Sequence, residues 1–394
     1  MSGPALLLLG FAVTGRPATG SALLAGVTIA GAAGGPAFGA LLDRSRRPER
    51  VLAGTLAAYA LGIAAVQVAV GRLPIPAVLL IALTAGLFSP AVAGGWTSQL
   101  PRLVTGPALA RGSALDAMSY SAASLAGPAL AALVAAGVSP AAAVLTAAGL
   151  TGLAVPAALA LARYPARAAP APDRLAWHRQ IAAGFAAIIR RRPLLRATVT
   201  SVVSYAGIGM LLVCCPVLGS QRLGAPSRGA LLISAIAAAS LAVNAVLARR
   251  PWRGPPDTAV LVSTLVIGAS MAAAALAPGW LTLAAVALGG AGEGPQLTAL
   301  FAVRHREAPA QMRGQIFTTA ASLKIAGMSA GAALAGPLAG HSVVTCLLVA
   351  AGLEVSAAAA YLLTGAIRPG PDGAGEPTGT ARARAAADAP ARSG

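Results

Sequence analysis

Three ionisable side chains, Glu293, Lys324 and Glu354, lie deep inside long stretches of apolar sequence. A charge held at the centre of a lipid bilayer costs at least about 2.5 kcal/mol, so such residues usually have a partner or a function. A buried carboxyl group can carry a proton or bind a substrate, and an ammonium group can neutralise a carboxylate. These three positions are therefore the first candidates for the chemistry of this chain.

Glu293 has the most unusual surroundings of the three. It lies in "GGAGEGPQ", where four glycines and Pro295 loosen a helix and can expose backbone groups to a cavity. Gln296 follows three residues later, on the same face of a helix. Because Glu293 and Lys324 belong to consecutive apolar stretches, we expect them either to pair directly or to share one polar cavity.

The composition indicates a membrane protein whose surroundings are the lipid bilayer. Hydrophobic residues make up 57% of the 394 residues and charged residues only 10%, against about 25% charged in an ordinary soluble domain. The net charge of +18 would suggest a nucleic-acid partner in a soluble chain. Here the basic residues are scattered between apolar blocks without stacking aromatic residues, so no nucleic acid is expected.

Eleven apolar stretches are long enough to cross a bilayer as helices, which takes about 20 residues each. They lack the alternation of barrel strands and lie approximately at 17–42, 51–71, 76–100, 113–136, 140–162, 197–219, 229–248, 258–277, 279–303, 314–337 and 342–364. A shorter stretch, Pro4 to Gly15, is expected to be the back part of a first helix whose front lies outside this chain. The sequence thus predicts an all-α polytopic membrane protein with twelve transmembrane segments.

The basic residues predict the orientation of these segments. Of the 29 Lys and Arg residues, 24 fall on one set of loops and the C-terminal tail, 4 fall on the opposite loops, and Lys324 lies inside a span. Basic residues mark the cytoplasmic side of membrane proteins. Both termini are therefore expected in the cytoplasm.

The longest charged interval divides the twelve segments into six and six. It predicts an N-terminal six-helix bundle at 1–162, a cytoplasmic linker at 163–196 and a second bundle at 197–367. The second part of the linker has apolar residues at helical spacing with arginines around them, which predicts an amphipathic helix on the membrane surface. Residues 368–394 are small, polar and rich in Pro and Gly, so a disordered tail is expected.

The histidines and cysteines give no sign of catalysis or of a metal or cofactor site. The histidines stand in separate loops and the cysteines lie in apolar runs, at His178, His305, His341, Cys214, Cys215 and Cys346. A membrane-embedded enzyme would need clustered catalytic groups, so it is the weaker alternative.

The two halves of the chain resemble each other faintly. "RGSALDAMSYSAASLAGPAL" begins the fifth segment and "RGQIFTTAASLKIAGMSAG" begins the eleventh, each with an Arg-Gly pair and a later glycine. Internal repeats of transmembrane helices are typical of secondary transporters, whose binding sites lie between the repeats.

Two motifs resemble the major facilitator superfamily, particularly its bacterial efflux members. The hairpin "GALLDRSRRPER" after the second segment follows the family pattern G-x-x-x-D-R-x-G-R-R at Gly39, Asp43, Arg44 and Arg47, with Arg46 and Pro48 as departures. "ASLAGPALAA" in the fifth segment fits the efflux pattern small-x-x-x-G-P-x-x-small-small, with Gly127 and Pro128 at its centre.

The resemblance implies two six-helix bundles related by a pseudo-two-fold axis, in a monomer of the bacterial inner membrane. Such a protein exports a small molecule or drug by alternating access. Proton-driven members commonly carry an arginine in helix 4, whereas 76–100 contains no charge, so proton coupling stays open. An inactive or truncated homologue is the alternative.

The resemblance also suggests roles for individual residues. Asp43 can accept hydrogen bonds from the N-terminus of a facing helix and hold the cytoplasmic gate closed, while Gly127 and Pro128 serve either a sealing bend or plain packing. Helices 1, 4, 7 and 10 line the cavity in this family, which favours Glu293 as a cavity residue. Trp96, Gln99 and Tyr205 are cavity candidates too, with helix packing as the favoured alternative for each. Helix 12 is peripheral there, so Glu354 is expected to be structural or to snorkel.

Overall fold

The protein folds into helices arranged as two halves. The computed structural model describes residues 1–164 and 176–366, and all regular secondary structure in these ranges is helical. The N-terminal half contains α1 (Ser2–Thr14), α2 (Pro17–Arg44), α3 (Pro48–Ala69), α4 (Ile75–Gly86), η1 (Ser89–Ala91), α5 (Gly94–Leu103), α6 (Pro107–Gly137), α7 (Pro140–Gly152) and α8 (Ala154–Ala160). The C-terminal half contains α10 (Arg192–Leu223), α11 (Gly229–Arg249), α12 (Pro256–Leu276), α13 (Leu281–Glu307), α14 (Arg313–His341) and α15 (Val343–Ala366).

The prediction of an all-α polytopic membrane protein is confirmed. Within the described ranges, nine helical segments are long and apolar enough to cross a membrane, and the shorter α1 is also apolar. The helices α13 and α14 complete the set of twelve, and they are less apolar because they carry Glu293, Lys324 and several further polar residues. Residues 165–175 of the predicted linker and the whole predicted tail, 368–394, lie outside the described residues.

The fourth segment differs from the continuous helix predicted at 76–100. It consists of α4, the single turn η1 and α5, and it ends at Leu103 rather than at residue 100. Pro90 in the turn has no backbone N–H to donate, and Gly94 and Gly95 follow four and five residues later, so the helix is interrupted here. The extension to Leu103 brings Arg102 into this segment.

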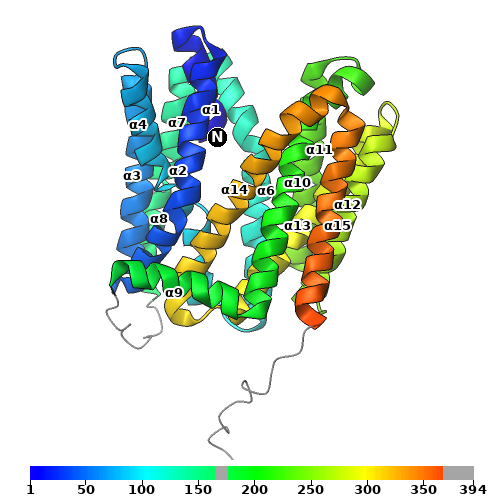
Figure 1. Cartoon of the computed structure of the whole chain (residues 1–394). Helices are drawn as coiled ribbons and strands as arrows, with labels where there is room; N and C mark the ends of the chain where they lie inside the picture. The colour runs from blue at the N-terminus through cyan, green and yellow to red at the C-terminus, as the bar shows by residue number, and fades with distance from the viewer. Residues whose placement is uncertain (165–175, 367–394) are drawn as a thin grey trace, which may run out of the picture.

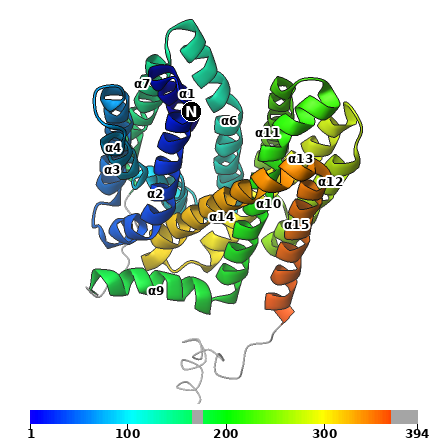
Figure 2. The ribbon, with the colours of Figure 1, turned by 45° about the horizontal axis from the view of Figure 1, so that its top comes forward.

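The two halves stand side by side, and α9 (Trp177–Arg190) lies across one end of them (Figure 1). We call this end the α9 end. The helix α14 runs obliquely from the α9 end of the N-terminal half to the opposite end of the C-terminal half, and Figures 1 and 2 show this course from two directions. It is therefore the helix that both halves share.

The first seam between the halves joins α2 to α14. Thr318 Oγ1 donates a hydrogen bond of 2.7 Å to the carbonyl of Gly35, and Ser322 Oγ donates one of 2.8 Å to the carbonyl of Gly31. At Gly39 the backbones approach so closely that a Cβ would collide with Gln315. Small residues permit such close contact between helices in membranes.

A second seam joins α6 to α11. The hydroxyls of Ser121 and Ser240 are 2.8 Å apart, and Arg111 Nε donates a hydrogen bond of 3.0 Å to the carbonyl of Ala248. Farther from the α9 end, the tight glycine contacts of α2 and α14 are within their own halves, at Gly20 and Gly331 respectively. The halves are thus held together at the α9 end.

We predict that Gly39→Ala destabilises the protein by about 1–3 kcal/mol, because the added methyl group overpacks the first seam. Gly54→Ala in α3 is the matched control, since a Cβ there meets no atom within 4 Å and alanine favours a helix. Thermal unfolding in detergent measures both variants. Equal melting temperatures for the two would contradict the close approach at Gly39.

Candidate functional site

Tyr205 on α10 brings together the two charged residues that the sequence singled out first. Its hydroxyl donates a hydrogen bond of 3.5 Å to Glu293 Oε1 on α13, and Lys324 Nζ on α14 lies 4.3 Å from the centroid of its ring. Tyr205 itself is only 8% exposed. An ammonium group over an aromatic ring is attracted by the electrons of that ring, most strongly where water is excluded.

The N-terminal half contributes Tyr120 of α6 to the same cluster. Lys324 Nζ lies 5.6 Å from the centroid of the Tyr120 ring, and the Tyr120 hydroxyl is 3.5 Å from Thr97 Oγ1 on α5. The Tyr120 ring also packs against Phe301 of α13, with the ring centroids 5.9 Å apart. We call Tyr120, Tyr205, Glu293 and Lys324 the central cluster, and it draws on both halves.

Glu293 and Lys324 form no direct ion pair among the described residues, whose salt bridges lie elsewhere. Lys324 is instead within electrostatic range of two carboxylates, Glu293 in its own half and Asp116 on α6. Of the two expected arrangements, a direct pair is therefore absent, and the two residues meet on the side chain of Tyr205.

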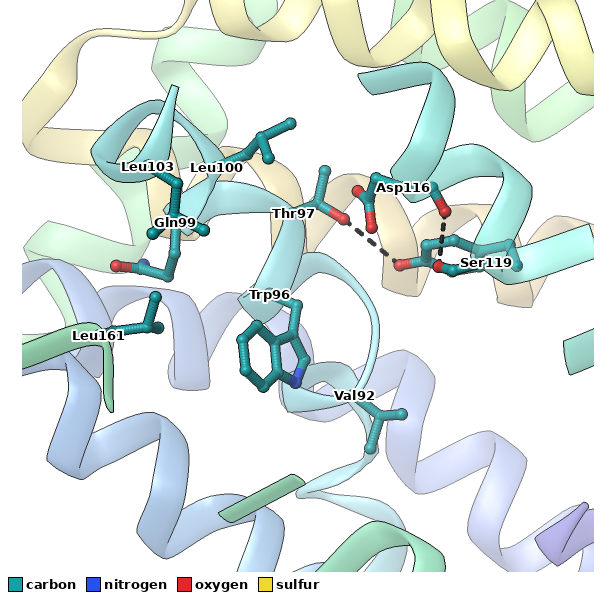
Figure 3. Close-up of a pocket in the computed structure, with 10 residues that line it drawn as sticks. Val92, Trp96, Thr97, Gln99, Leu100, Leu103, Asp116, Ser119 and Leu161 are labelled. Carbon is teal, nitrogen blue, oxygen red and sulfur yellow. Dashed lines mark hydrogen bonds between the residues drawn. The ribbon is translucent and has the colours of Figure 1, made fainter. Parts of the chain in front are cut away.

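A cavity of about 340 Å³ adjoins the central cluster at Tyr120. Trp96 and Gln99 line it, together with Thr97 and Asp116 (Figure 3). Asp116 Oδ2 is buried and has no hydrogen-bond partner among the described residues. The rest of the lining is largely apolar, at Val92, Leu100, Leu103 and Leu161.

The fourth segment contains a charged residue, Arg102, because the segment extends beyond residue 100. Its guanidinium donates hydrogen bonds to Gln99 Oε1 at 3.0 Å and to the carbonyl of Leu161 at 3.2 Å, and Nη2 lies 3.5 Å from Glu49 Oε2. These partners hold the arginine at the α9 end of the N-terminal half. Gln99 is therefore oriented by Arg102 as well as lining the cavity.

Gln296 and Glu354 lie inside the C-terminal half and not at the junction of the halves. Gln296 Nε2 donates hydrogen bonds to Ser204 Oγ at 3.0 Å and to Thr264 Oγ1 at 2.8 Å. Glu354 is 0% exposed and accepts a hydrogen bond of 2.9 Å from Ser204. Snorkelling of Glu354 to the interface is thus ruled out, because helix packing directs its side chain into the bundle.

Asp43 joins the halves at the α9 end. The backbone N–H groups of Gly314 and Gln315, in the first turn of α14, donate to its Oδ1 and Oδ2, each at 2.8 Å. The first N–H groups of a helix have no partner within it and carry the positive end of the helix dipole, so a carboxylate is well suited to accept from them. We call this arrangement the α14 latch.

The helix α9 packs on the α14 latch, which the sequence did not predict. Gln315 Nε2 donates to the carbonyl of Ile181 at 2.9 Å, and Gln180 Nε2 donates to the carbonyl of Ala40 at 3.4 Å. The guanidinium carbon of Arg44 lies 5.8 Å from the centroid of the Trp177 ring. Arg47 is exposed at the start of α3.

Gly127 and Pro128 lie in the middle of α6, which continues through the proline. Gly127 is buried, and a Cβ at this position would lie 2.9 Å from the backbone nitrogen of Met1. The observed contact is therefore helix packing against the start of the chain.

No group of three His, Cys, Asp or Glu residues within the described ranges could hold a metal ion. The three cysteines are buried and unpaired.

Comparison with known proteins assigns the chain to one family. The family model described as Major Facilitator Superfamily matches residues 1–332. The chain belongs to the major facilitator superfamily. An uncharacterized MFS-type transporter of Sinorhizobium fredii, y4rN, is 28% identical over 292 residues, which cover 73% of this chain and 71% of the relative.

Solved structures share the superfamily fold with this chain. The human organic anion transporter MFSD10 (TETRAN) is 17% identical, with a TM-score of 0.69 over 91% of this chain and 97% of that one. The Escherichia coli fucose:proton symporter FucP is 15% identical, with a TM-score of 0.69 over 91% and 93%. A bacterial homologue of ferroportin in the outward-facing state is 16% identical, with a TM-score of 0.69 over 93% and 98%.

Membership of the superfamily makes this chain a multi-pass membrane protein of a family of secondary transporters. At these identities the solved structures establish the fold alone.

We predict that Asp43→Asn opens the α14 latch. Asparagine keeps one acceptor oxygen and loses the charge, which removes about 1–2 kcal/mol from the contact. A maleimide should then label Ser322→Cys roughly tenfold faster, because Ser322 is 1% exposed in the closed seam. The native cysteines are buried and set the background.

Arg50→Gln is the control for this labelling, because Arg50 is exposed at the start of α3. With Arg50→Gln, the maleimide should label Ser322→Cys at the same rate as in the parent that carries Ser322→Cys alone. Unchanged labelling of the Asp43→Asn variant at normal expression would show that the seam closes without the carboxylate.

We predict that Glu293→Gln and Lys324→Met are coupled in a double-mutant cycle. Each single variant leaves a buried charge with less compensation, whereas the double variant removes both charges. The interaction energy should reach about 0.5–3 kcal/mol, measured by thermal unfolding in detergent. Strictly additive losses would mean that contact through Tyr205 does not link the two side chains.

Proposed function

We propose that the protein exports a small molecule or drug from the bacterial cytoplasm by alternating access, in exchange for protons. The observation that carries the proposal is the central cluster. A half-buried acid and a half-buried amine share one tyrosine at the junction of the halves without forming an ion pair. Binding of a proton or of a charged substrate changes the charge beside the acid and the amine. The pair can therefore respond to either event.

The orientation of the proposal rests on the positive-inside rule. The α9 end bears the arginine-rich hairpin after α2 and the basic residues around α9. We therefore assign this end to the cytoplasm and the inner membrane as the location. The described conformation, joined at the α9 end, is then the one that opens outward.

Three residues have distinct roles in the proposed cycle. Asp43 holds the cytoplasmic end closed through the first turn of α14. Glu293 carries the exchanged proton, and Lys324 on α14 neutralises it when that proton leaves. Because Lys324 and the latch lie on one helix, opening of the latch moves the amine relative to Glu293.

The cavity beside Tyr120 is proposed as part of the substrate path. Its apolar lining with one buried carboxylate and the ring of Trp96 suits a small amphipathic compound. The efflux motif at Gly127 and Pro128 supports export as the direction. The family comparison leaves the direction and the coupling ion to experiment.

The test is a flux assay in inverted membrane vesicles with anionic, neutral and cationic fluorescent compounds. We predict that at least one compound accumulates when the vesicle interior is acidified, and that a protonophore abolishes the accumulation. Glu293→Gln should reduce this uptake by at least tenfold, because the amide cannot carry a proton. Arg50→Gln, at an exposed position, should leave the uptake unchanged.

Accumulation that persists with the protonophore, or full uptake by the Glu293→Gln variant, would overturn proton exchange through Glu293. Uptake only into vesicles of the native orientation would overturn export.

A further inference from the structure

The C-terminal half contains a second carboxyl group, Glu354, which is fully buried and which the proposed cycle does not use. It lies on α15, and its side chain points towards α10 and α12. Gly207 of α10 and Gly268 of α12 leave room for it, since a Cβ at these positions would lie 3.2 Å from Glu354 Oε1 and 2.9 Å from Glu354 Cβ. Glycines at these two positions therefore leave space for the Glu354 side chain inside the bundle.

Only one of the two oxygens of Glu354 has a partner. Ser204 Oγ donates to Oε1 at 2.9 Å, whereas Oε2 is buried and has no hydrogen-bond partner among the described residues. Ser204 in turn receives a hydrogen bond from Gln296 Nε2, and the same amide donates to Thr264. Of the two acceptors within reach of the Ser204 hydroxyl, Glu354 Oε1 at 2.9 Å is nearer than Gln296 Oε1 at 3.4 Å.

None of the described Lys or Arg residues lies within 4 Å of the carboxyl oxygens of Glu354. The titratable group within electrostatic range of it is Glu293 on α13, which is also acidic. Lys324 on α14 contacts Tyr205, the partner of Glu293. From α12 Glu354 faces Gly268, which does not titrate. A carboxyl group in such surroundings is held as the neutral acid.

Glu354 and Glu293 are contacted by consecutive residues of α10. Ser204 contacts Glu354, and the next residue, Tyr205, contacts Glu293. On α13, Gln296 contacts Ser204 from a position three residues after Glu293. The polar group around Glu354 is therefore a neighbour of the central cluster with hydrogen bonds of its own.

Towards the α9 end an apolar layer covers the polar group around Glu354. One or two turns from Ser204, Thr264, Gln296 and Glu354, the four helices contribute Ala197, Ala259, Val260, Ala299, Leu300, Val303 and Tyr361. Beyond the layer, Asp257 pairs with Arg196 and Arg306. In this conformation the layer separates Glu354 from the α9 end.

We propose that Glu354 is a second proton-binding site of the C-terminal half, apart from Glu293 in the central cluster. It holds the proton away from the α9 end while the central cluster faces the opposite side. This inference rests on the proposed proton exchange. It adds a group outside the central cluster that must be protonated for the C-terminal half to pack as described.

The direct test is an infrared pH titration of the purified full-length protein in detergent, which needs no substrate. We expect a carboxylic-acid carbonyl band that persists to alkaline pH. It should disappear in Glu354→Gln and remain in Glu293→Gln. Ser204→Ala should shift the same band, because it removes the hydrogen bond to Oε1 and keeps the carboxyl group.

Ser270→Ala is the matched control for Ser204→Ala, since Ser270 is equally buried and donates only within its own helix, to Ile267. It should leave the band unchanged. Retention of the band in Glu354→Gln would overturn the proposal. Loss of the band from the parent protein when sodium chloride is added at constant pH would also overturn the proposal, and would assign the site to sodium.

Vesicle flux then separates this inference from the proposed function. With a compound that the parent transports, Glu354→Gln should keep downhill exchange and lose at least tenfold in accumulation driven by the proton gradient. Accumulation equal to that of the parent would reduce Glu354 to a structural hydrogen-bond partner. If the parent transports none of the compounds, the proposed function fails while the infrared titration still decides whether Glu354 holds a proton.

Discussion

The structure depends on the fact that polar groups inside a membrane must find their partners within the protein. The first N–H groups of α14 have no acceptor in their own helix, and Asp43 of the other half accepts two of them. This contact needs an unbroken helix start at Arg313, a glycine at 314 and a close approach at Gly39. The halves are therefore joined by groups that neither half can satisfy alone.

The same helix connects the latch to the central cluster. Gly314 and Gln315 begin α14, and Lys324 follows about three turns later. Between them, Thr318 and Ser322 donate to backbone carbonyls of α2. Because each of these contacts is short and directional, α14 cannot leave α2 at one point and keep the others. When the halves separate, all of these contacts between α14 and α2 are expected to break together, and Lys324 is expected to move.

Much of the fold could be read from the sequence, because span length and charge placement follow from the thickness and low polarity of a bilayer. The break at Pro90 and the inclusion of Arg102 were missed, since both depend on where one helix ends within a continuous apolar run. Glu293, Lys324 and Tyr205 could be singled out as candidates, but their meeting on one aromatic ring depends on interhelical geometry. Ser204 and Thr264 gave no signal, because hydroxyl residues are common in apolar helices and often bond to their own backbone.

The acids in and beside the central cluster are divided between the two halves. Glu293 and Glu354 lie in the C-terminal half and contact neighbouring residues of α10, whereas the N-terminal half offers Asp116 and the ring of Tyr120. Lys324 stands between them and interacts with acids on both sides. Under the proposed function, protonation of Glu293 weakens the attraction within the C-terminal half and favours Asp116. The net electrostatic force on Lys324, and so on α14, then depends on which carboxyl groups hold protons. Protonation in the C-terminal half is thereby linked to contact between the halves.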